Sequence, residues 1–438
     1  MLRKLKKVTV SICLLIMIQL MGLSILSPST SFAAEIPTPS LQVKSAILIE
    51  ASTGQVLYSL NADEARPPAS MAKMMTEYVV MTAIKEGRIT PEDQVTISHY
   101  AAEVIGSGQQ LAEGKQFTVR DLLRNMIIYS GNDAAVALAE YVGNGSETNF
   151  VQMMNEAAKE MGLSDTAYFA NATGLSNAED LGQFAPDVPG ETMISAEDVA
   201  KLARRLITDF PESLEFSSIP RTTLHEDDPN STQIDNWNWM LEGWKEYNNN
   251  FSAYAYDGMD GLKTGHTDEA GYCFTGTAER DGMRLISVVM GAANEPERFN
   301  QTRVLMDYGF NNFEMKTILA AKSKVEALET VHVKKAKDTD VPVVVSEGVV
   351  FAVRKGEVDD AFKLEASPMD EKELVAPIKE GDKVGQVTVT YNGPNGEVKQ
   401  TVDLLAAEDA DKANWFILLM RAIKEFFVNL IDSIKNLF

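Results

Sequence analysis

The sequence predicts a mixed α+β domain, followed by a small all-β domain and a C-terminal amphipathic helix. Helical and strand-like patterns alternate up to about residue 315, whereas 316–407 contains only strand-like runs separated by charged or glycine-containing turns. The last residues, 413–438, have a helix pattern with apolar side chains on one side. At 438 residues the chain is also too long for one compact core, so two or three domains are expected.

Residues 1–33 have the pattern of an export signal. A basic start is followed by an apolar run from Val8 to Leu26 and by the small-x-small sequence Ser31-Phe32-Ala33. The basic residues are Arg3, Lys4, Lys6 and Lys7. We therefore predict an exported protein that begins at Ala34 after cleavage, with its first domain at 34–315. An uncleaved membrane anchor is the alternative.

The overall composition is that of a globular protein, with 45% hydrophobic and 24% charged residues. The formal net charge is −23, and outside the first seven residues the sequence has no cluster of Lys and Arg. Because binding to phosphates requires such clusters, a nucleic-acid partner is not expected. The acidity itself is interpreted as a contribution to solubility.

Cysteine and histidine usage gives no sign of a disulfide or a metal site. Loss of the signal would leave Cys273 as the one cysteine, and its apolar surroundings indicate a buried small hydrophobic residue. The histidines are His99, His225, His266 and His332. None of them has a metal-ligand spacing, so a metallopeptidase is set aside and neither a metal nor a cofactor is expected.

The first predicted elements of the exported chain are a hairpin and a buried helix. Ala46 to Glu50 and Val56 to Leu60 are apolar runs separated by Ser52-Thr53-Gly54, which is typical of a β-hairpin. A helix pattern then follows Pro67-Pro68 and stops near Gly87. Since its apolar residues cover every side, we expect this helix to run through the protein interior.

At the start of this helix, Ser70-Met71-Ala72-Lys73 places a hydroxyl and an amine on one face. A lysine is rarely buried unless it is paired, because desolvation of its ammonium is costly. Burial can lower a lysine pKa by ~3–5 units, which would make Lys73 a usable base near neutral pH. Ser70 also lies at the helix N-terminus, where free N–H groups favour developing negative charge. The alternative, an N-cap serine beside a solvated lysine, does not fit the apolar surroundings.

A second motif, Ser130-Gly131-Asn132, falls in a break between two helix patterns. Thr118 to Tyr129 is predicted as one helix and Ala134 to Val142 as another, which ends at Gly143. Alone, the motif would be interpreted as a cap and a turn. Beside the first motif, the hydroxyl of Ser130 and the amide of Asn132 become candidates for a proton relay and for a clamp on a substrate amide.

A third motif, Lys263-Thr264-Gly265, lies on a predicted strand from Gly261 to Thr267. That strand leads through a turn into Tyr272 to Ala278 and then into Met283 to Met290, so three antiparallel strands follow one another. Gly265 leaves one side of the first strand open to a ligand backbone, and Lys263 supplies a positive charge beside it. Each of the three motifs is weak alone, but their order along the chain is a strong signal.

With its motifs in this order, the chain resembles the serine-type D-alanyl-D-alanine carboxypeptidases, which are low-molecular-mass penicillin-binding proteins of the peptidase S11 type. The resemblance covers nearly the whole exported chain, from the segment around Ser70 to the β-rich tail and terminal helix. It implies a penicillin-binding/β-lactamase-like fold, in which an antiparallel sheet has helices on both faces. It also implies removal of the terminal D-alanine from peptidoglycan stem peptides ending in D-Ala-D-Ala, which limits cross-linking, and covalent inhibition by β-lactam antibiotics.

The resemblance further implies catalytic roles at the matching positions. Ser70 would attack the carbonyl of the penultimate D-alanine, and Lys73 would take its proton. Ser130 would relay a proton to the departing D-alanine nitrogen. The backbone N–H groups of Ser70 and His266 would form the oxyanion hole. Water would then release the acyl-enzyme.

Substrate-binding roles are implied in the same way. Asn132 would orient the peptide amide of the substrate. Lys263 would tune Ser130 and, together with Thr264 and Thr267, would hold the terminal carboxylate of the peptide.

Related functions of this fold stay open as alternatives. Class A β-lactamases carry a glutamate on a loop after the second motif, whereas 169–175 has no acidic residue and Gly131 stands where many lactamases have aspartate. A slow β-lactamase side activity is one alternative, and transpeptidation, which shares the acyl-enzyme, is another. A non-catalytic cell-wall-binding protein is disfavoured by the intact Ser70, Lys73 and Ser130.

Two further segments have more than one interpretation. The polar stretch Thr222 to Tyr256 holds Trp237, Trp239 and Trp244, and it either lines a peptide groove or is a surface loop pinned by these rings. The β-rich segment 316–407 carries no motif for catalysis. It is interpreted as a spacer that holds the first domain away from a surface, with protein docking as the alternative.

The helix pattern at 413–438 indicates an anchor at a membrane surface. Its apolar side consists of Leu419, Met420, Ile423, Phe426, Phe427, Leu430, Ile434 and Leu437. The opposite side carries Arg421, Glu425, Asp432 and Asn436. Charges recur too often for a membrane-spanning helix, so we expect this helix to lie in the interface on the outer face of the bacterial cytoplasmic membrane. Packing against a partner or the protein itself is the alternative.

Overall fold

The computed structural model describes residues 37–224 and 231–435, and Pro39 onward belongs to one compact unit. The predicted export signal at 1–33 lies outside the described residues, as do His225 and Leu437. Signal cleavage therefore stays a prediction.

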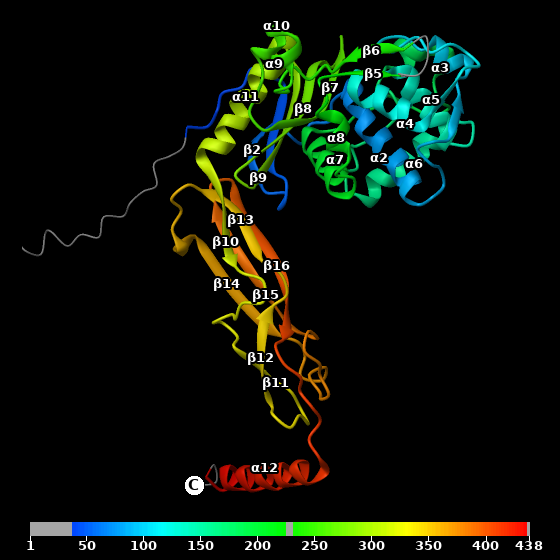
Figure 1. Cartoon of the computed structure of the whole chain (residues 1–438). Helices are drawn as coiled ribbons and strands as arrows, with labels where there is room; N and C mark the ends of the chain where they lie inside the picture. Colours follow the sequence, from blue (N-terminus) through cyan, green and yellow to red (C-terminus); the bar gives the residue numbers. More distant parts are fainter. Residues whose placement is uncertain (1–36, 225–230, 436–438) are drawn as a thin grey trace, which may run out of the picture. The chain divides into compact units, whose positions relative to one another are not determined.

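The centre of the first domain is a five-stranded antiparallel sheet with the order β2-β1-β9-β8-β7 (Figure 1). β1 (Ser45–Glu50) and β2 (Val56–Leu60) form the predicted hairpin. β7 (Met259–Thr267), β8 (Gly271–Arg280) and β9 (Met283–Ala292) are the three predicted consecutive strands. β7 carries the third motif and lies at an edge of the sheet, so no strand of the described residues pairs with its outer side.

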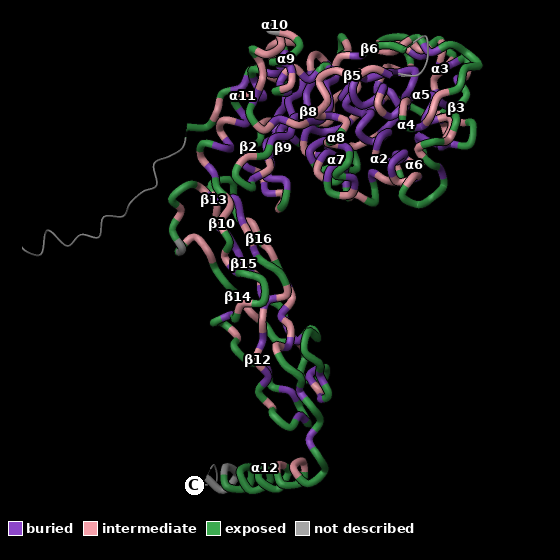
Figure 2. Tube along the Cα trace, in the orientation of Figure 1, coloured by how far each residue is buried: buried purple, intermediate pink, exposed green. Residues whose placement is uncertain are grey.

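Helices cover both faces of this sheet, as predicted. Ile47 and Ile49 point into a core shared with α2 (Lys73–Lys85) and α7 (Ala196–Asp209). Ala46 and Leu48, which alternate with them, pack against α11 (Glu295–Asn312) on the other face. Figure 2 shows that the trace around β8, β9 and α2 is mostly buried. The all-round apolar pattern of α2 is explained by this position in the interior.

Shorter helices and two small hairpins complete the first domain. The 3-10 turn η1 (Ala69–Ala72) leads into α2, and the π-helical turn η2 (Asn125–Tyr129) follows α4. The other helices are α3 (His99–Glu103), α4 (Val119–Arg124), α5 (Asn132–Val142), α6 (Glu147–Glu160), η3 (Asn177–Leu181), η4 (Gly182–Phe184), α8 (Ser213–Ser217), α9 (Trp244–Tyr247) and α10 (Asn249–Ser252). The hairpins pair β3 (Gln94–Thr96) with β4 (Gln116–Thr118), and β5 (Arg221–Leu224) with β6 (Thr232–Asp235).

The residues from β10 (Phe313–Leu319) to β16 form an all-β domain with its own valine-rich core. Its five-stranded sheet has the order β11-β12-β16-β15-β14, and β10 pairs separately with β13. The strands are β11 (Thr330–His332), β12 (Asp340–Val345), β13 (Val349–Arg354), β14 (Phe362–Pro368), β15 (Lys383–Gly393) and β16 (Gly396–Ala406), with the short turn η5 (Asp359–Ala361) before β14.

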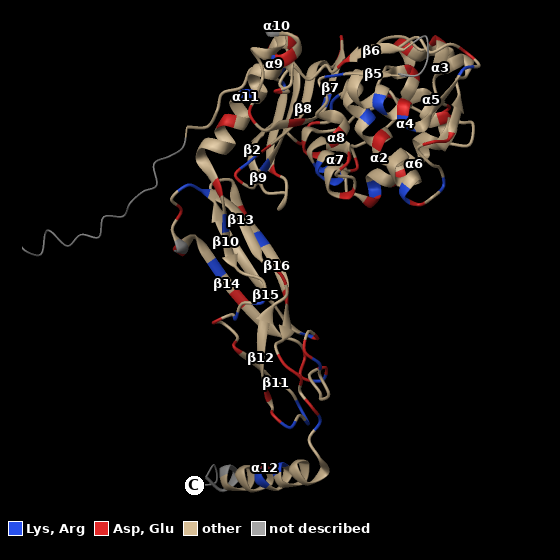
Figure 3. Ribbon diagram, in the orientation of Figure 1, with Lys and Arg blue, Asp and Glu red and all other residues tan. Residues whose placement is uncertain are grey.

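The last helix, α12 (Trp415–Lys435), exposes large apolar side chains. Trp415, Phe416, Phe426 and Phe427 are each more than half exposed. Figure 3 shows α12 as a mostly uncharged helix with a few basic positions. Within the described residues, no helix is long and apolar enough to cross a membrane.

Candidate active site

Ser70 and Lys73 lie at the junction of η1 and α2. The Lys73 Nζ is 2.8 Å from Ser70 Oγ, and it donates to Asn132 Oδ1 at 2.7 Å and to the Thr173 carbonyl oxygen at 3.0 Å. Lys73 is 1% exposed, and burial lowers its pKa well below the ordinary lysine value, with a further contribution from the charge of Lys263. In its neutral form the amine would have two N–H donors, for Asn132 and Thr173, and its lone pair would face the Ser70 hydroxyl.

Two glycines allow other segments to approach the backbone next to Ser70. A Cβ at Gly174 would lie 2.0 Å from the Ala69 carbonyl oxygen, and a Cβ at Gly265 would lie 2.5 Å from the Pro68 carbonyl oxygen. Ala69 has a φ of 48°, a conformation that costs about 1–3 kcal/mol for a residue other than glycine. The position of Ser70 is therefore fixed from two sides by close backbone packing.

Ser130 and Asn132 reach the site from the end of η2. Ser130 has a φ of 66°, and this left-handed residue ends the helix predicted over 118–129. Asn132 begins α5, and its side-chain amide donates to the Ile105 carbonyl oxygen at 2.6 Å while Oδ1 accepts from Lys73. Both residues line the cavity above Ser70. In this structure Asn132 holds Lys73, and its contact with a substrate amide stays a prediction.

Lys263, on β7, is the second buried lysine of the site. It is 4% exposed, and its Nζ donates to the Thr264 carbonyl oxygen at 3.1 Å. Burial, followed by the positive charge of Arg298, lowers the pKa of Lys263 to about 7. Among the described residues its ammonium is not part of the cavity wall, and its charge is one cause of the lowered pKa of Lys73.

The remaining predicted residues of β7 divide between two hollows. Thr264 and His266 line the same cavity as Ser70. Thr267 instead lines an adjoining hollow together with His266, and its Oγ1 accepts from the Ala270 backbone at 3.1 Å. The structure thus brings Thr264 and His266 to Ser70, and it places Thr267 at the start of the turn beside the cavity.

The cavity above Ser70 has a volume of about 360 Å³, and its wall contains an arginine that the sequence did not reveal. Arg298, from α11, is 3% exposed and donates to Glu295 Oε1 at 2.6 Å, while its Nε has no hydrogen-bond partner among the described residues. A guanidinium that faces a cavity is suited to binding a carboxylate. In the sequence, Glu295 and Arg298 have the i,i+3 spacing of an ordinary surface ion pair, which gives no hint of this position.

Two tryptophans of the stretch Thr222 to Tyr256 have different surroundings, and its role as a peptide groove stays a prediction. Trp237 is 37% exposed and lines the cavity, with its ring nitrogen donating to the Tyr129 carbonyl oxygen at 2.9 Å. Trp244 is fully buried, and its ring nitrogen donates to the Asn238 carbonyl oxygen at 2.8 Å. One tryptophan therefore forms part of the cavity wall, and the other anchors the segment in the core.

The loop 169–175 is shaped by the side chain of Asn171. Asn171 Oδ1 accepts from the backbone of Thr173 at 3.0 Å and of Gly174 at 2.7 Å, and its amide donates to the Leu175 carbonyl oxygen at 2.8 Å. This turn presents the Thr173 carbonyl oxygen to Lys73. The loop contributes a carbonyl to the site, and its segment contains no carboxylate.

Together these residues have the arrangement of a serine acyl-transfer site in which lysine takes the place of histidine as the base. The Ser70 hydroxyl contacts a desolvated amine, and a second serine and the buried Arg298 line the same cavity as Ser70. No three His, Cys, Asp or Glu side chains within the described ranges gather closely enough to hold a metal ion.

Comparison with known proteins identifies the family. The family model for D-alanyl-D-alanine carboxypeptidase, peptidase S11, matches residues 31–294, and the model for the C-terminal domain of penicillin-binding protein 5 matches 313–412. D-alanyl-D-alanine carboxypeptidase DacF of Bacillus subtilis is 35% identical over 385 residues, which cover 88% of this chain and 90% of DacF.

Two solved structures of penicillin-binding proteins are also similar to this chain. The peptidoglycan synthesis regulatory factor PBP3 of Streptococcus pneumoniae has a TM-score of 0.72 and 32% identity, covering 85% of this chain and 100% of that chain. Penicillin-binding protein D2 of Listeria monocytogenes, in its ampicillin-bound form, has a TM-score of 0.52 and 33% identity, covering 63% of this chain and 99% of that chain. The chain belongs to the peptidase S11 family of D-alanyl-D-alanine carboxypeptidases. The predicted family, fold class and enzyme class are thereby confirmed.

Proposed function

We propose that Ser70 is the nucleophile of this carboxypeptidase and that Lys73 is its general base. The observation that carries the proposal is the 2.8 Å contact between Lys73 Nζ and Ser70 Oγ at the floor of the cavity. Burial favours the neutral amine, and a base positioned in this way typically contributes ~10²–10⁴ in rate.

The reaction then follows from the positions of the residues. Lys73 takes the proton of Ser70 Oγ, and the oxygen attacks the carbonyl carbon of the penultimate D-alanine. The resulting oxyanion accepts from the backbone N–H groups of Ser70 and His266. As the C–N bond breaks, Ser130 gives a proton to the leaving D-alanine nitrogen and regains one from Lys73. Water hydrolyses the remaining ester and frees Ser70.

The carboxylate of the terminal D-alanine would bind at the cationic end of the cavity. Thr264 and Arg298 both line the cavity, and the buried Lys263 would add its positive charge nearby. Thr267 would join them only after a change at the turn beside the cavity. Asn132 would orient the peptide amide while it also holds Lys73.

β-Lactam antibiotics are proposed as covalent inhibitors that acylate Ser70. The ampicillin-bound Listeria protein D2, which is similar in structure, supports this assignment. Efficient β-lactamase activity is less well supported, because the loop 169–175 offers a carbonyl and no acidic side chain near Lys73.

For its location, we propose export and attachment to the outer face of the cytoplasmic membrane. The signal pattern at 1–33 supports export. The exposed apolar side chains of α12 support attachment through 413–438, with the catalytic domain at 34–315 and the β-rich spacer at 316–407.

The test is D-alanine release from an N-acylated peptide ending in D-Ala-D-Ala, with the chain from Ala34 onward. Release should vanish in Ser70→Ala and persist in Ser107→Ala, which removes another serine of the same cavity. Mass spectrometry should find a penicillin adduct on the peptide that contains Ser70. Unchanged release by Ser70→Ala would reject the assignment of the nucleophile. No release, with penicillin still attached to Ser70, would show that the natural substrate is different.

A further inference from the structure

A buried glutamate lies one helical turn beyond Lys73. Glu77, on α2, is 4% exposed, and it accepts a hydrogen bond from Ser213 Oγ at the start of α8. It does not line the cavity that holds Ser70, so it has no direct part in the chemistry. A carboxylate in such a position is costly unless a nearby positive charge compensates it.

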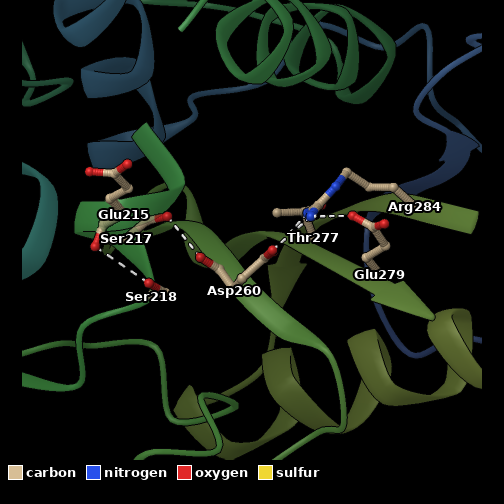
Figure 4. A network of polar contacts seen from close by, with 7 residues as sticks. All are labelled: Glu215, Ser217, Ser218, Asp260, Thr277, Glu279 and Arg284. Carbon is tan, nitrogen blue, oxygen red and sulfur yellow. Dashed lines mark hydrogen bonds and ion pairs between the residues drawn. The ribbon is translucent and has the colours of Figure 1, made fainter. Parts of the chain in front are cut away.

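α8, which donates a hydrogen bond to Glu77 through Ser213, also contacts β7, the strand that carries Lys263. Ser217, at the other end of α8, donates to the Asp260 carbonyl oxygen at 2.9 Å (Figure 4). Asp260 is held in turn by Arg284 of β9 through two contacts of 2.8 Å. Next along β7, a Cβ at Gly261 would lie 2.8 Å from Ser217 Oγ, so helix and strand are in close contact. α8 therefore links Glu77 to the part of β7 that leads into Lys263.

Lys263 is the cation that Glu77 can compensate. No ion pair within 4.0 Å is formed by Lys263 in the described part of the chain, although its ammonium is buried. The charged groups coupled to it are Arg298 from α11, Glu77 from α2 and the neighbouring Lys73, whose pKa the charge of Lys263 lowers. Glu77 is hydrogen-bonded to Ser213, and the charges that act on it are those of Lys263 and the exposed Glu212. Burial raises the pKa of Glu77 to about 7, and both Ser213 and Lys263 oppose that rise.

We propose that Glu77 is a positioning residue of the active site, whose carboxylate, held by Ser213, keeps the buried Lys263 protonated. This rests on the proposed roles of Ser70 and Lys73. A protonated Lys263 disfavours a second positive charge on Lys73 and so maintains the neutral base. It also keeps a cation near the site for the substrate carboxylate. Loss of the Glu77 charge would let Lys263 lose its proton at a lower pH.

The test is the second-order rate of acylation by penicillin, measured from about pH 5 to about pH 10, because this rate reports the pKa values of the free enzyme. The acid limb should report loss of the proton from Lys73, and the alkaline limb loss of the proton from Lys263. In Glu77→Gln, which keeps the shape of the side chain, the alkaline limb should move to lower pH by about one unit. That shift means a roughly tenfold loss on the alkaline side, with little change on the acid side.

Two further variants complete the experiment. Ser213→Ala removes the donor to Glu77 and should shift the alkaline limb in the same direction by a smaller amount. Glu215→Gln removes an exposed carboxylate of α8 that is not among the groups acting on Glu77 and should leave the profile unchanged. End-point labelling with excess fluorescent penicillin counts the folded sites in each sample. If Glu77→Gln does not fold, Ser213→Ala decides the question.

The outcomes separate this proposal from the one on which it rests. An unchanged alkaline limb in the folded variants, or an equal loss at every pH, would overturn the role of Glu77. Acylation that persists in Ser70→Ala would instead overturn the nucleophile, whatever the profile of Glu77→Gln.

Discussion

At the scale of single residues, the site is defined by buried cations. Lys73, Lys263 and Arg298 are each at most 4% exposed, and burial lowers the pKa of all three. Such groups are rarely tolerated in a core, because desolvation favours their neutral forms. Here burial lowers the pKa values of these groups by different amounts, which suits them to different roles. In the proposed mechanism the lowered pKa of Lys73 suits it to accept a proton, whereas Arg298, whose pKa is lowered only to about 10, would stay charged for a carboxylate.

Replacement of Arg298 by alanine should weaken recognition of the terminal carboxylate. A hydrogen bond to a charged group contributes about 1.5–3 kcal/mol, so kcat/KM for a D-Ala-D-Ala peptide should fall roughly ten- to hundredfold. The effect should appear mainly in KM, because Arg298 does not contact the reacting atoms of Ser70 or Lys73.

An amidated peptide gives the control for this prediction. The unmodified protein should prefer the free carboxylate over the amide, and Arg298→Ala should lose most of that preference. A preference that stays unchanged in the variant would place the carboxylate elsewhere in the cavity. The matched variant Arg303→Ala, on the same helix, should keep the preference.

At the scale of elements, three segments meet at the backbone of Ser70. η1 carries the serine, the loop 169–175 approaches it at Gly174, and the edge strand β7 approaches it at Gly265. The loop also supplies the Thr173 carbonyl oxygen that accepts from Lys73. The geometry of the nucleophile and base therefore depends on how closely this loop can pack.

Gly174→Ala should lower the rate of acylation by penicillin, in addition to its effect on the stability of the fold. Gly174 has a φ of 80°, and an added Cβ would meet the Ala69 carbonyl oxygen at 2.0 Å, so the loop or η1 must move. Gly162→Ala is the matched control, because its φ is 70° and no atom lies within 4 Å of the added Cβ. Both variants should lose about 1–2 kcal/mol of stability from the backbone conformation alone.

The two glycine variants should differ in acylation rate. Gly174→Ala should acylate at least roughly tenfold more slowly with penicillin, since small displacements of reacting groups are costly. Gly162→Ala should acylate at the normal rate, and thermal unfolding should register the stability loss in both. Equal acylation rates in the two variants would mean that the packing of Gly174 on Ala69 does not position Ser70.

At the scale of the whole molecule, the parts that could be predicted are those with a strong local pattern. The hairpin, the apolar helix and the three-stranded meander were predicted from periodicity, and the three motifs were predicted to meet because of their order. In the β-rich domain, the strand-like runs predicted at 331–333, 343–345, 349–353 and 387–391 fall on β11, β12, β13 and β15, whereas β14 and β16 were missed. β14 carries charged side chains on a largely exposed strand and buries little, so it leaves no alternating apolar pattern.

The parts of the site that could not be predicted depend on contacts between distant segments. Arg298 and Glu77 look like ordinary helix residues in the sequence, and only the packing of α11 on β8 and β9, and of α8 on β7, shows their position near the site. The sequence could not show which of the three tryptophans lies in the cavity wall. The structure places Trp237 there, where its ring nitrogen donates to the Tyr129 carbonyl oxygen. The motifs predict which residues contact the substrate, whereas the charges that shift the pKa values of those residues depend on the fold.

The attachment of the whole molecule to a membrane can be tested through α12. Phe426 and Phe427 are both more than half exposed, and burial of each in a lipid interface would contribute about 1.5–3 kcal/mol. The double variant Phe426→Ser/Phe427→Ser should therefore bind vesicles of phosphatidylethanolamine and phosphatidylglycerol roughly a hundredfold or more weakly in a sedimentation assay. Glu425→Gln, on the opposite side of the helix, should bind normally, and D-alanine release from a soluble peptide should be the same in all variants. Equal vesicle binding by the double variant would mean that the apolar side of α12 does not enter the lipid, and a helix docked on a protein partner would then explain its exposed aromatic rings.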